Sequence, residues 1–198
     1  MRADLEIISQ WIRPGSRVLD LGCGDGTLLR HLRDHRQVDG VGMELADENI
    51  VRCIEAGIPV VQEDLDDGLE TWFAPGSFDH VVMTQTLQAI RHPERLLSQM
   101  LTIGREGIVT FPNMAYWRNR LQFALGGHMP VTATLPNPWY NTPNIHLCTL
   151  RDFESLCAEF NFRILDRTVV DRQHRDNPLL HVLPNLFGEI AIYRIERG

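Results

Sequence analysis

Three glycines stand at alternate positions where an apolar run meets a helical pattern. Residues 18–21 have strand character, Gly22, Gly24 and Gly26 follow, and Thr27 begins a helical spacing of leucines. Glycine lets the main chain adopt positive φ and lets a ligand approach it closely, while a helix amino terminus offers unpaired N–H donors. A strand, a tight glycine turn and a helix start together predict a ligand cradle.

The ligand is restricted by what this turn lacks and by the acid that precedes it. Gly26-Thr27 is not followed by the lysine of a phosphate-binding P-loop, and Thr27 stands where the dinucleotide fingerprint needs its third glycine. Asp20 would repel a pyrophosphate and would suit a positively charged ligand. S-adenosylmethionine carries an ammonium, a sulfonium and no phosphate, so it fits best. The predicted contacts in this stretch are Asp20, Gly22, Cys23 and Gly24.

Further candidate ligand contacts follow the next three predicted strands. Glu44 ends the second strand, about twenty residues past the turn, where a carboxylate accepts both ribose hydroxyls. Asp64 ends the third strand and is placed to accept from an adenine amine, with Leu45 and Leu65 as apolar surfaces for the ring. Singly, such acids are more often solvated loop residues or helix caps, but their order at successive strand ends favours a nucleoside site. Gln85, after the fourth strand, completes the predicted set.

The elements that position these residues alternate between strand and helix. Helical spacing is expected over 4–12, from 27, from 47 to about 56, and over 93–101, with Ile50, Val51 and Ile54 facing inward. Nearly apolar strands are expected over 18–21, 38–45, 59–62, 78–83 and 107–111. This alternation predicts an α/β fold, a mostly parallel sheet covered by helices on both faces.

The carboxyl-terminal third departs from this alternation. A helix is expected over 150–160, burying Phe153, Leu156 and Cys157. Two successive strands then follow over 162–170 and 187–195, joined by a polar loop over 171–186. Because no helix separates these strands, they are expected to form an antiparallel pair at one edge of the sheet.

Residues 112–149 break the pattern with five prolines and several aromatic residues. Asn113 is expected to cap a helix carrying Met114, Trp117, Leu121 and Leu125. One interpretation is a loop packed over the sheet; the other is a lid or partner surface, since long ordered loops are often functional. Aromatic residues and arginine are enriched at interfaces. The candidate partner surface is therefore Trp117, Arg118, Arg120, Trp139 and Tyr140.

Composition limits the class of protein. The 198 residues suit one domain, residues 1–198 with the 112–149 insert. A formal charge of −7 argues against sequence-independent nucleic-acid binding, which needs Lys and Arg to neutralise phosphates. The four cysteines lack C-x-x-C spacing and the histidines lack metal-ligand spacing, so reduced thiols, a cytoplasmic location and no metal are expected. Neither a membrane-spanning run nor a signal-peptide core is apparent.

Over nearly its whole length the sequence resembles the class I S-adenosylmethionine-dependent methyltransferases. This resemblance implies a Rossmann-like three-layer sandwich, a seven-stranded sheet of order 3-2-1-4-5-7-6 with strand seven antiparallel. A narrower resemblance, to the methionine-biosynthesis family MetW, is carried by segments 18–26, 85–88, 111–113, 117–122, 129–132 and 139–148. It implies a protein that supports a homoserine O-acyltransferase (MetX) and that binds S-adenosylmethionine or S-adenosylhomocysteine.

No acid/base residue for methyl transfer is evident. Where many small-molecule methyltransferases carry Leu-Glu-His, this chain has Leu87-Gln88-Ala89. The remaining candidates are His146, His128, His92, Tyr116 and Tyr140; His146 is expected to be a structural histidine and His92 a turn or cap residue. No G-x-S-x-G motif is present, so acyl transfer is not expected of this chain. Two hypotheses follow: an accessory, regulatory subunit that binds the nucleoside, or an active methyltransferase on a small-molecule acceptor.

Overall fold

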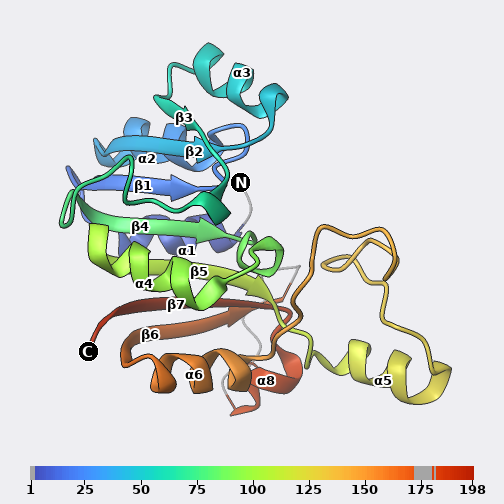
Figure 1. Cartoon of the computed structure of the whole chain (residues 1–198). Helices are drawn as coiled ribbons and strands as arrows, with labels where there is room; N and C mark the ends of the chain where they lie inside the picture. The colour runs from blue at the N-terminus through green and yellow to red at the C-terminus, as the bar shows by residue number, and fades with distance from the viewer. Residues whose placement is uncertain (1–2, 172–179, 181) are drawn as a thin grey trace.

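A single mixed sheet organises the protein, as seen in a computed structural model that describes residues 3–171, 180 and 182–198 (Figure 1). Its strands are β1 (Arg17–Leu21), β2 (Asp39–Glu44), β3 (Val60–Gln62), β4 (Phe78–Thr84), β5 (Gly104–Pro112), β6 (Phe162–Val170) and β7 (Ile190–Arg197). The strand order is β3-β2-β1-β4-β5-β7-β6. β1 to β5 are parallel, and β7 runs antiparallel to both β5 and β6. The order and directions implied by the resemblance are therefore confirmed.

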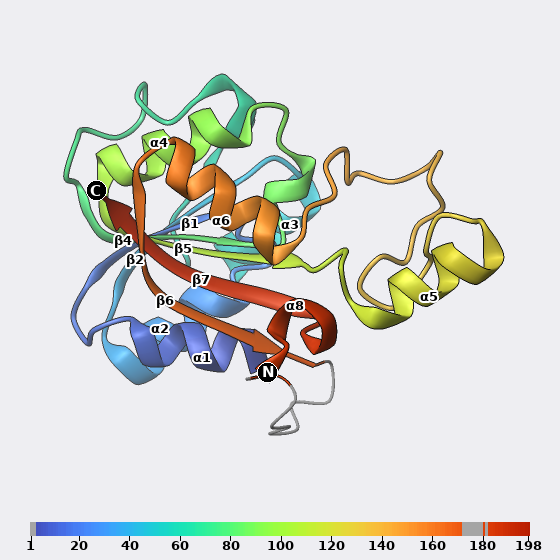
Figure 2. The same cartoon turned by 90° about the horizontal axis from the view of Figure 1, so that it is seen from below.

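Helices cover both faces of this sheet. The described helices are α1 (Ala3–Trp11), α2 (Thr27–Arg36), α3 (Asp47–Glu55), α4 (Pro93–Ile103), α5 (Trp117–Gly126), α6 (Leu150–Glu159) and α8 (Pro184–Phe187), with 3₁₀ turns η1 (Leu65–Asp67) and η2 (Leu87–Ala89). Figure 2 shows α1 and α2 on one face and α4 and α6 on the other. The chain between β5 and α6, which includes α5, extends away from the sheet at the carboxyl ends of the parallel strands (Figures 1 and 2).

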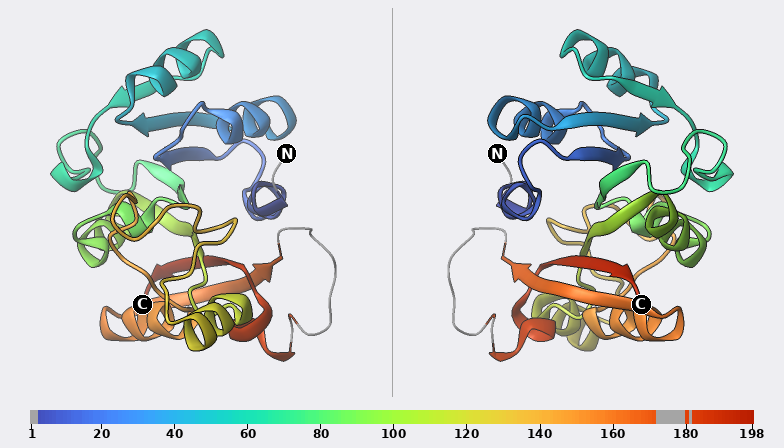
Figure 3. Two further views of the ribbon diagram at one scale, coloured as in Figure 1. Left: turned by 90° about the vertical axis from the view of Figure 1, so that its right-hand side faces the viewer. Right: turned by 90° about the vertical axis from the view of Figure 1, so that its left-hand side faces the viewer.

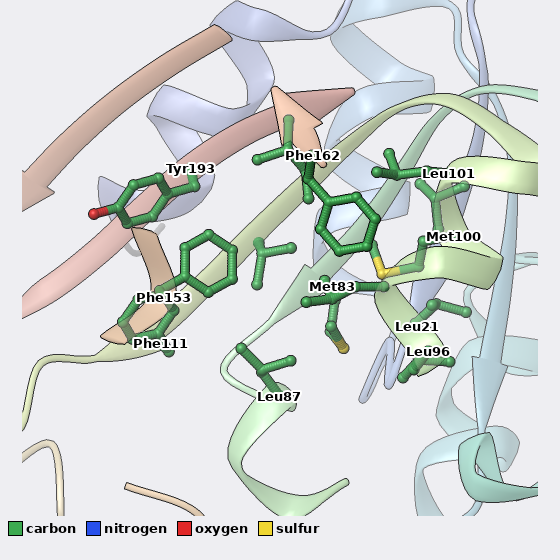
Figure 4. Close-up of a cluster of buried hydrophobic side chains, with 14 of the residues drawn as sticks. Leu21, Met83, Leu87, Leu96, Met100, Leu101, Phe111, Phe153, Phe162 and Tyr193 are labelled. Carbon is green, nitrogen blue, oxygen red and sulfur yellow. The ribbon is translucent and has the colours of Figure 1, made fainter. Parts of the chain in front are cut away.

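The side chains of each strand alternate between two separate apolar clusters. In β1, Leu19 and Leu21 belong to the cluster beneath α4 and α6, whereas Val18 belongs to the cluster beneath α1 and α2. This alternation follows from the period-two geometry of a strand, and it places Asp20 on the α1 and α2 face. Figure 4 shows the larger cluster, in which the ring of Phe153 lies 5.0 Å from that of Phe111 and 4.7 Å from that of Tyr193.

The inward face predicted for α3 is wrong. Val51 and Ile54 are exposed, Ile50 is only partly buried, and the fully buried residue of this helix is Cys53. α3 lies beside β3 at the end of the sheet (Figure 1), and its buried side chain, Cys53, packs against the glycine turn. A Cβ placed on Gly26 would lie only 3.1 Å from the sulfur of Cys53, and this close packing favours glycine at position 26.

The cap predicted at Asn113 is also wrong, because α5 begins at Trp117 with Tyr116 as its N-cap. Asn113 is buried at the end of β5 and serves another turn. Its amide donates to the carbonyl oxygens of Gly188 (2.8 Å) and Asn185 (3.1 Å), and its side-chain oxygen accepts from the Ala115 N–H. These carbonyls have no strand partner in the pairing of β5 with β7, so the asparagine supplies the donor.

The predicted antiparallel edge pair is confirmed, with a shifted second strand. β6 spans the predicted residues, but β7 begins at Ile190 rather than at 187. Phe187 instead ends α8, which starts at Pro184, a residue suited to the first position of a helix. Of the predicted loop 171–186, residues 172–179 and 181 lie outside the described residues.

Candidate functional site

The glycine turn after β1 is held by backbone hydrogen bonds to β2. The N–H groups of Gly22 and Cys23 both donate to the carbonyl of Met43, at 2.8 and 3.2 Å. Gly22, Gly24 and Gly26 have φ of 69°, 56° and 73°. A Cβ on Gly22 would lie 2.6 Å from Thr86 Oγ1, whereas a Cβ on Gly24 would meet nothing within 4 Å. Gly22 is therefore required by packing, and the main chain at Gly24 borders open space.

Glu44, at the end of β2, is bound to this turn. Its Oε2 accepts the N–H of Gly24 at 2.8 Å, and its Oε1 accepts the N–H groups of Leu45 and Ala46 at 2.9 and 3.0 Å. A carboxylate has about four acceptor positions, so one position on Oε2 remains for a ligand hydroxyl. The structure thus brings Glu44 and the glycine turn together, as the sequence predicts.

Two further acids lie toward the carboxyl ends of the same parallel strands. Asp20 is the next-to-last residue of β1, a central strand, and is only 1% exposed. Asp64 lies two residues beyond Gln62, the β3 residue paired with Glu44. It caps η1, because its Oδ1 accepts the Asp66 N–H at 2.9 Å. Of the two apolar residues predicted to face a ring, Leu45 is exposed and Leu65 packs in the core.

Gln85 follows β4 with a positive φ of 53°, an uncommon conformation for a residue other than glycine. Its N–H donates to the carbonyl and hydroxyl oxygens of Thr110. Its side-chain amide lies 3.4 Å from Asp4 Oδ2 of α1. The strained backbone therefore turns the Gln85 side chain toward α1 and the face of the sheet that carries Asp20.

Sequence reasoning missed Asp4, Thr86 and Cys53 at this site. Asp4 is buried at 1% exposure, and its helical spacing with Ile8 and Ile12 was the available signal, since it places a carboxylate on an apolar face. Thr86 packs against Gly22. No local pattern distinguishes Thr86 or Cys53 from ordinary turn and helix residues.

Cys53 forms a pair of buried thiols with Cys23 beneath the turn. Their sulfurs are 3.8 Å apart, and the Cys53 thiol donates to the carbonyl of Gly24 at 3.2 Å. Burial raises the pKa of both thiols, with smaller contributions from Asp20 and Glu44. Both sulfurs therefore remain protonated at neutral pH, which makes Cys23 a packing residue of the cradle rather than a nucleophile.

Gln88, at the expected acid/base position, lines a cavity of about 100 Å³ together with residues of α6. It is 3% exposed, and its Oε1 accepts no hydrogen bond within the described part of the chain. The position thus holds a neutral amide that packs on the α6 side. Backbone N–H groups of Ile145 and His146 donate to the Gln88 carbonyl at 2.9 and 3.0 Å, and this contact ties the 112–149 insert to η2.

The other acid/base candidates have structural contacts or are solvent-exposed. His146 Nε2 lies 3.3 Å from the carbonyl oxygen of Arg91, and His92 is the N-cap residue of α4. Burial raises the pKa of the Tyr116 phenol, which therefore stays protonated at neutral pH. His128 and Tyr140 are exposed on the insert.

The insert presents a broad exposed apolar surface. Trp139 and Tyr140 are each 74% exposed and meet edge to face at 5.8 Å, and the Arg118 guanidinium lies 5.4 Å from the Trp117 ring centroid. Arg120 instead donates from Nε to the Ala115 carbonyl at 2.6 Å. A hollow of about 220 Å³ opens beside Trp139, lined by Met114, Met129, Pro130, Leu135, Asn137, Thr142, Asn144, Ile145 and Leu147. Exposed apolar patches of this kind mark interaction sites.

The described residues form neither a cluster of metal ligands nor a helix that could span a membrane. Across 3–171, 180 and 182–198, no three His, Cys, Asp or Glu side chains are grouped so that they could hold a metal ion. No helix in these ranges is both long and apolar enough to cross a membrane.

Comparison with known proteins identifies the family. The sequence model of the methionine biosynthesis protein MetW matches residues 2–195. The chain belongs to the MetW family. A family relative, the bifunctional methionine biosynthesis protein MetXA/MetW of Rhodopirellula baltica, is 35% identical over the whole chain, which covers 33% of that protein. A nocamycin O-methyltransferase of Saccharothrix syringae is 32% identical over 53% of the chain and 42% of its own length. The chain thus spans less than half the length of either relative.

Solved structures establish the fold of this MetW family member. A methyltransferase dependent on S-adenosylmethionine from Archaeoglobus fulgidus superposes with a TM-score of 0.71 at 15% identity, covering 99% of this chain and 92% of that one. One from Mesorhizobium loti gives 0.69 at 19% identity and 98% coverage of both chains. The class I methyltransferase fold expected from the resemblance is confirmed for this member of the methionine biosynthesis protein MetW family.

Proposed function

We propose that this chain is an accessory, regulatory subunit of methionine biosynthesis that binds S-adenosylmethionine or S-adenosylhomocysteine and engages a homoserine O-acyltransferase, MetX. One observation carries the proposal: in Rhodopirellula baltica a domain 35% identical to this chain is part of a bifunctional MetXA/MetW protein. Two activities fused in one relative are often partners when they are separate chains. A cytoplasmic location accompanies this role.

The residues at the edge of β1 to β4 fit the nucleoside. Glu44 retains an acceptor position for a ribose hydroxyl, and Asp64 retains Oδ2 for an adenine amine. Open space at Gly24 admits a ligand close to the main chain, and Asp20 adds negative charge that favours an ammonium or sulfonium. Gly22 and Cys23 form the turn itself, Leu65 is the proposed apolar surface for the adenine ring, and Gln85 follows β4 at the same ends of the strands. When bound, S-adenosylmethionine supplies an electrophilic methyl group.

An accessory role is favoured by the neutral amide of Gln88, which stands where many small-molecule methyltransferases carry an acid/base pair. A general base typically contributes about 10²–10⁴-fold. Gln88 is neutral, the Cys23 thiol stays protonated, and His146 is hydrogen-bonded to the backbone. Gln88 and His146 line a cavity with α6 residues, and the Cys23 thiol carries no basic group, so none of the three is placed as a base for an acceptor at the cradle. Binding without turnover is the property of a sensor.

The insert and the cradle are joined by short contacts, which supports regulation. Both lie at the carboxyl edge of the parallel strands (Figure 1). Ile145 and His146 bind the Gln88 carbonyl in η2, and Thr86, next to η2, packs against Gly22. A partner seated on Trp117, Arg118, Arg120, Trp139 and Tyr140 would therefore bias the position of η2. Coupling of this kind is reciprocal: ligand and partner must change each other's affinity by the same factor.

Calorimetry tests the proposal. S-adenosylhomocysteine is titrated into the chain alone and into its complex with the acyltransferase, and the two affinities are expected to differ. Equal affinities would remove the coupling, and failure to bind would remove the nucleoside site. Trp139→Ala and Arg118→Ala are expected to weaken co-purification with the acyltransferase, with thermal melting as the check on folding. Survival of the complex in both variants would make the insert a structural cover.

A second candidate function is methyl transfer to a small-molecule acceptor bound under the insert. It is favoured by 32% identity to the nocamycin O-methyltransferase over about half of the chain. Methyl transfer can depend largely on proximity and orientation, so a missing base weighs against it without excluding it. Incubation with labelled S-adenosylmethionine and candidate metabolites discriminates the two functions. Measured binding of the nucleoside without transfer of label would count against an enzyme.

A further inference from the structure

A cleft at one end of the molecule gathers three arginines from three different elements. It has a volume of about 380 Å³ and lies where α5, α6, β6 and the segment 182–186 meet. Arg120 comes from α5, Arg151 from α6 and Arg167 from β6. Figure 3 shows α6 and β6 at the end of the sheet opposite β2 and α3, so this cleft is separate from the glycine turn and Glu44.

The single acid among the described lining residues, Glu154, is already engaged. Its Oε1 accepts from Arg167 Nη1 at 2.7 Å and from the Tyr193 hydroxyl at 2.9 Å. Because Tyr193 is fully buried, this contact fixes Glu154 and Arg167 against the core. Three guanidinium groups and one carboxylate leave the described lining with a net charge of +2.

The other two arginines keep donors for a ligand. Arg120 is oriented by its Nε bond to the Ala115 carbonyl, and its terminal amino groups make no hydrogen bond among the described residues. Arg151 is exposed, and its side chain forms neither an ion pair nor a hydrogen bond within that part of the chain. The guanidinium fork binds phosphate through two parallel N–H donors.

The rest of the cleft is mainly apolar, and this limits the kind of ligand further. Leu150, Leu183, Pro184 and Leu186 line it beside the arginines. Its volume falls within the range of about 300–1,000 Å³ typical of small-molecule sites. An ion as small as inorganic phosphate would leave the apolar wall uncovered.

We propose that this cleft binds a phosphate monoester of an organic molecule. The dianion of a monoester balances the net charge of +2, whereas a carboxylate would leave one positive charge uncompensated. The organic part of the ligand packs on the leucine and proline side chains. This second ligand site is separate from the nucleoside cradle, and it shares Arg120 with the acyltransferase surface proposed above.

Calorimetry on the full chain at low salt tests the site with three probes: phenyl phosphate, benzoate and inorganic phosphate. Phenyl phosphate is expected to bind at least tenfold more tightly than benzoate, which shares the ring, and than inorganic phosphate, which lacks it. Arg151→Gln is expected to weaken phenyl phosphate binding about tenfold, equivalent to ~1.4 kcal/mol. Arg30→Gln removes an exposed charge from α2 and is the matched control. Glu154→Gln, which raises the net charge, is expected to tighten binding.

Three results would overturn the proposal. Equal weakening by Arg151→Gln and Arg30→Gln would reduce the effect to general charge attraction. Equal affinity for phenyl phosphate and benzoate would remove the role of the dianion. Absence of phenyl phosphate binding by a chain that melts cooperatively would remove the site altogether.

Discussion

At the scale of single residues, Glu44 has two roles that mutation can separate. It accepts the Gly24 N–H and is proposed to accept a ribose hydroxyl. Charge-assisted hydrogen bonds are worth roughly 1.5–3 kcal/mol. Glu44→Ala is therefore expected to weaken S-adenosylhomocysteine binding about 10- to 150-fold by calorimetry.

Two variants serve as controls for this measurement. Glu44→Gln keeps an acceptor for the turn while removing the charge, so it should retain the melting temperature better than Glu44→Ala. Glu48→Ala removes an exposed carboxylate of α3, four residues after Glu44, and should leave the affinity for S-adenosylhomocysteine unchanged. Unaltered binding in Glu44→Ala would show that the ribose assignment is wrong.

His80 gives the protein a residue-level dependence of stability on pH. This buried β4 histidine faces Glu106 at 3.3 Å, with Asp79, Arg13 and Arg194 contributing at longer range. Burial lowers the pKa of His80 and outweighs the attraction of Glu106. Below the ordinary histidine pKa of about 6.5, the unfolded chain therefore binds a proton that the folded chain does not. The free energy of unfolding should fall as pH drops below that value.

Urea unfolding at pH 7.5 and pH 5.5 measures this effect. We expect the wild-type protein to lose more stability between the two pH values than His80→Gln, which cannot titrate. Other groups contribute equally to both proteins, so the difference isolates the histidine. An identical loss in the two proteins would assign the acid sensitivity to other residues.

At the scale of elements, α6 depends on the cap that starts it. Thr149 and Asp152 form a capping box: the threonine hydroxyl accepts the Asp152 N–H, and the aspartate carboxylate accepts the Thr149 N–H at 2.9 Å. Loss of such a cap costs ~1 kcal/mol. Thr149→Ala should lower the free energy of unfolding by about that amount, whereas Ser155→Ala, exposed in the same helix, should not. Equal effects would mean that tertiary packing alone fixes the start of α6.

Strands and helices whose sequence period matches their burial could be predicted from the sequence. The strand order needed the family resemblance, because periodicity at β4 or β5 carries no information on which strands are neighbours. The predicted inward face of α3 was wrong because its apolar residues are exposed and Cys53 packs inward. The predicted helix cap at Asn113 was wrong because the hydrogen-bond partners of this residue, Asn185 and Gly188, are more than 70 residues away in sequence. A side chain caps the helix next to it in sequence only when no distant group forms a hydrogen bond with that side chain instead.

The candidate site was predictable to the extent that it is built from strand ends. Glu44 and the glycine turn meet because β1 and β2 are adjacent parallel strands. The spacing of α1 places Asp4 on an apolar face, but its contact with Gln85 was not predictable, because the two residues are 81 positions apart in sequence. The charged cleft was not predictable either, since Arg120, Arg151 and Arg167 are brought together only by the packing of three separate elements.

At the scale of the whole molecule, the insert is expected to be separable from the fold. Its two ends meet where the Met114 N–H donates to the Cys148 carbonyl at 3.0 Å, and the segment that contains α5 extends away from the sheet (Figure 2). Replacement of residues 117–144 by a short Gly-Ser linker retains this junction and the Ile145 contact to η2. Little core is lost, so the stability cost is expected to stay near 1 kcal/mol, or about 2–4 °C in Tm.

This deletion separates the two halves of the proposed function in one protein. S-adenosylhomocysteine should still bind, because Glu44 and the glycine turn make no described contact with the removed segment. Co-purification with the acyltransferase should be lost, because the deletion removes Trp117, Arg118 and Trp139. Trp139→Ala is the milder companion that leaves the rest of the insert in place. If the shortened chain still forms the complex, the docking surface lies elsewhere; if it loses the nucleoside as well, the insert is part of the cradle.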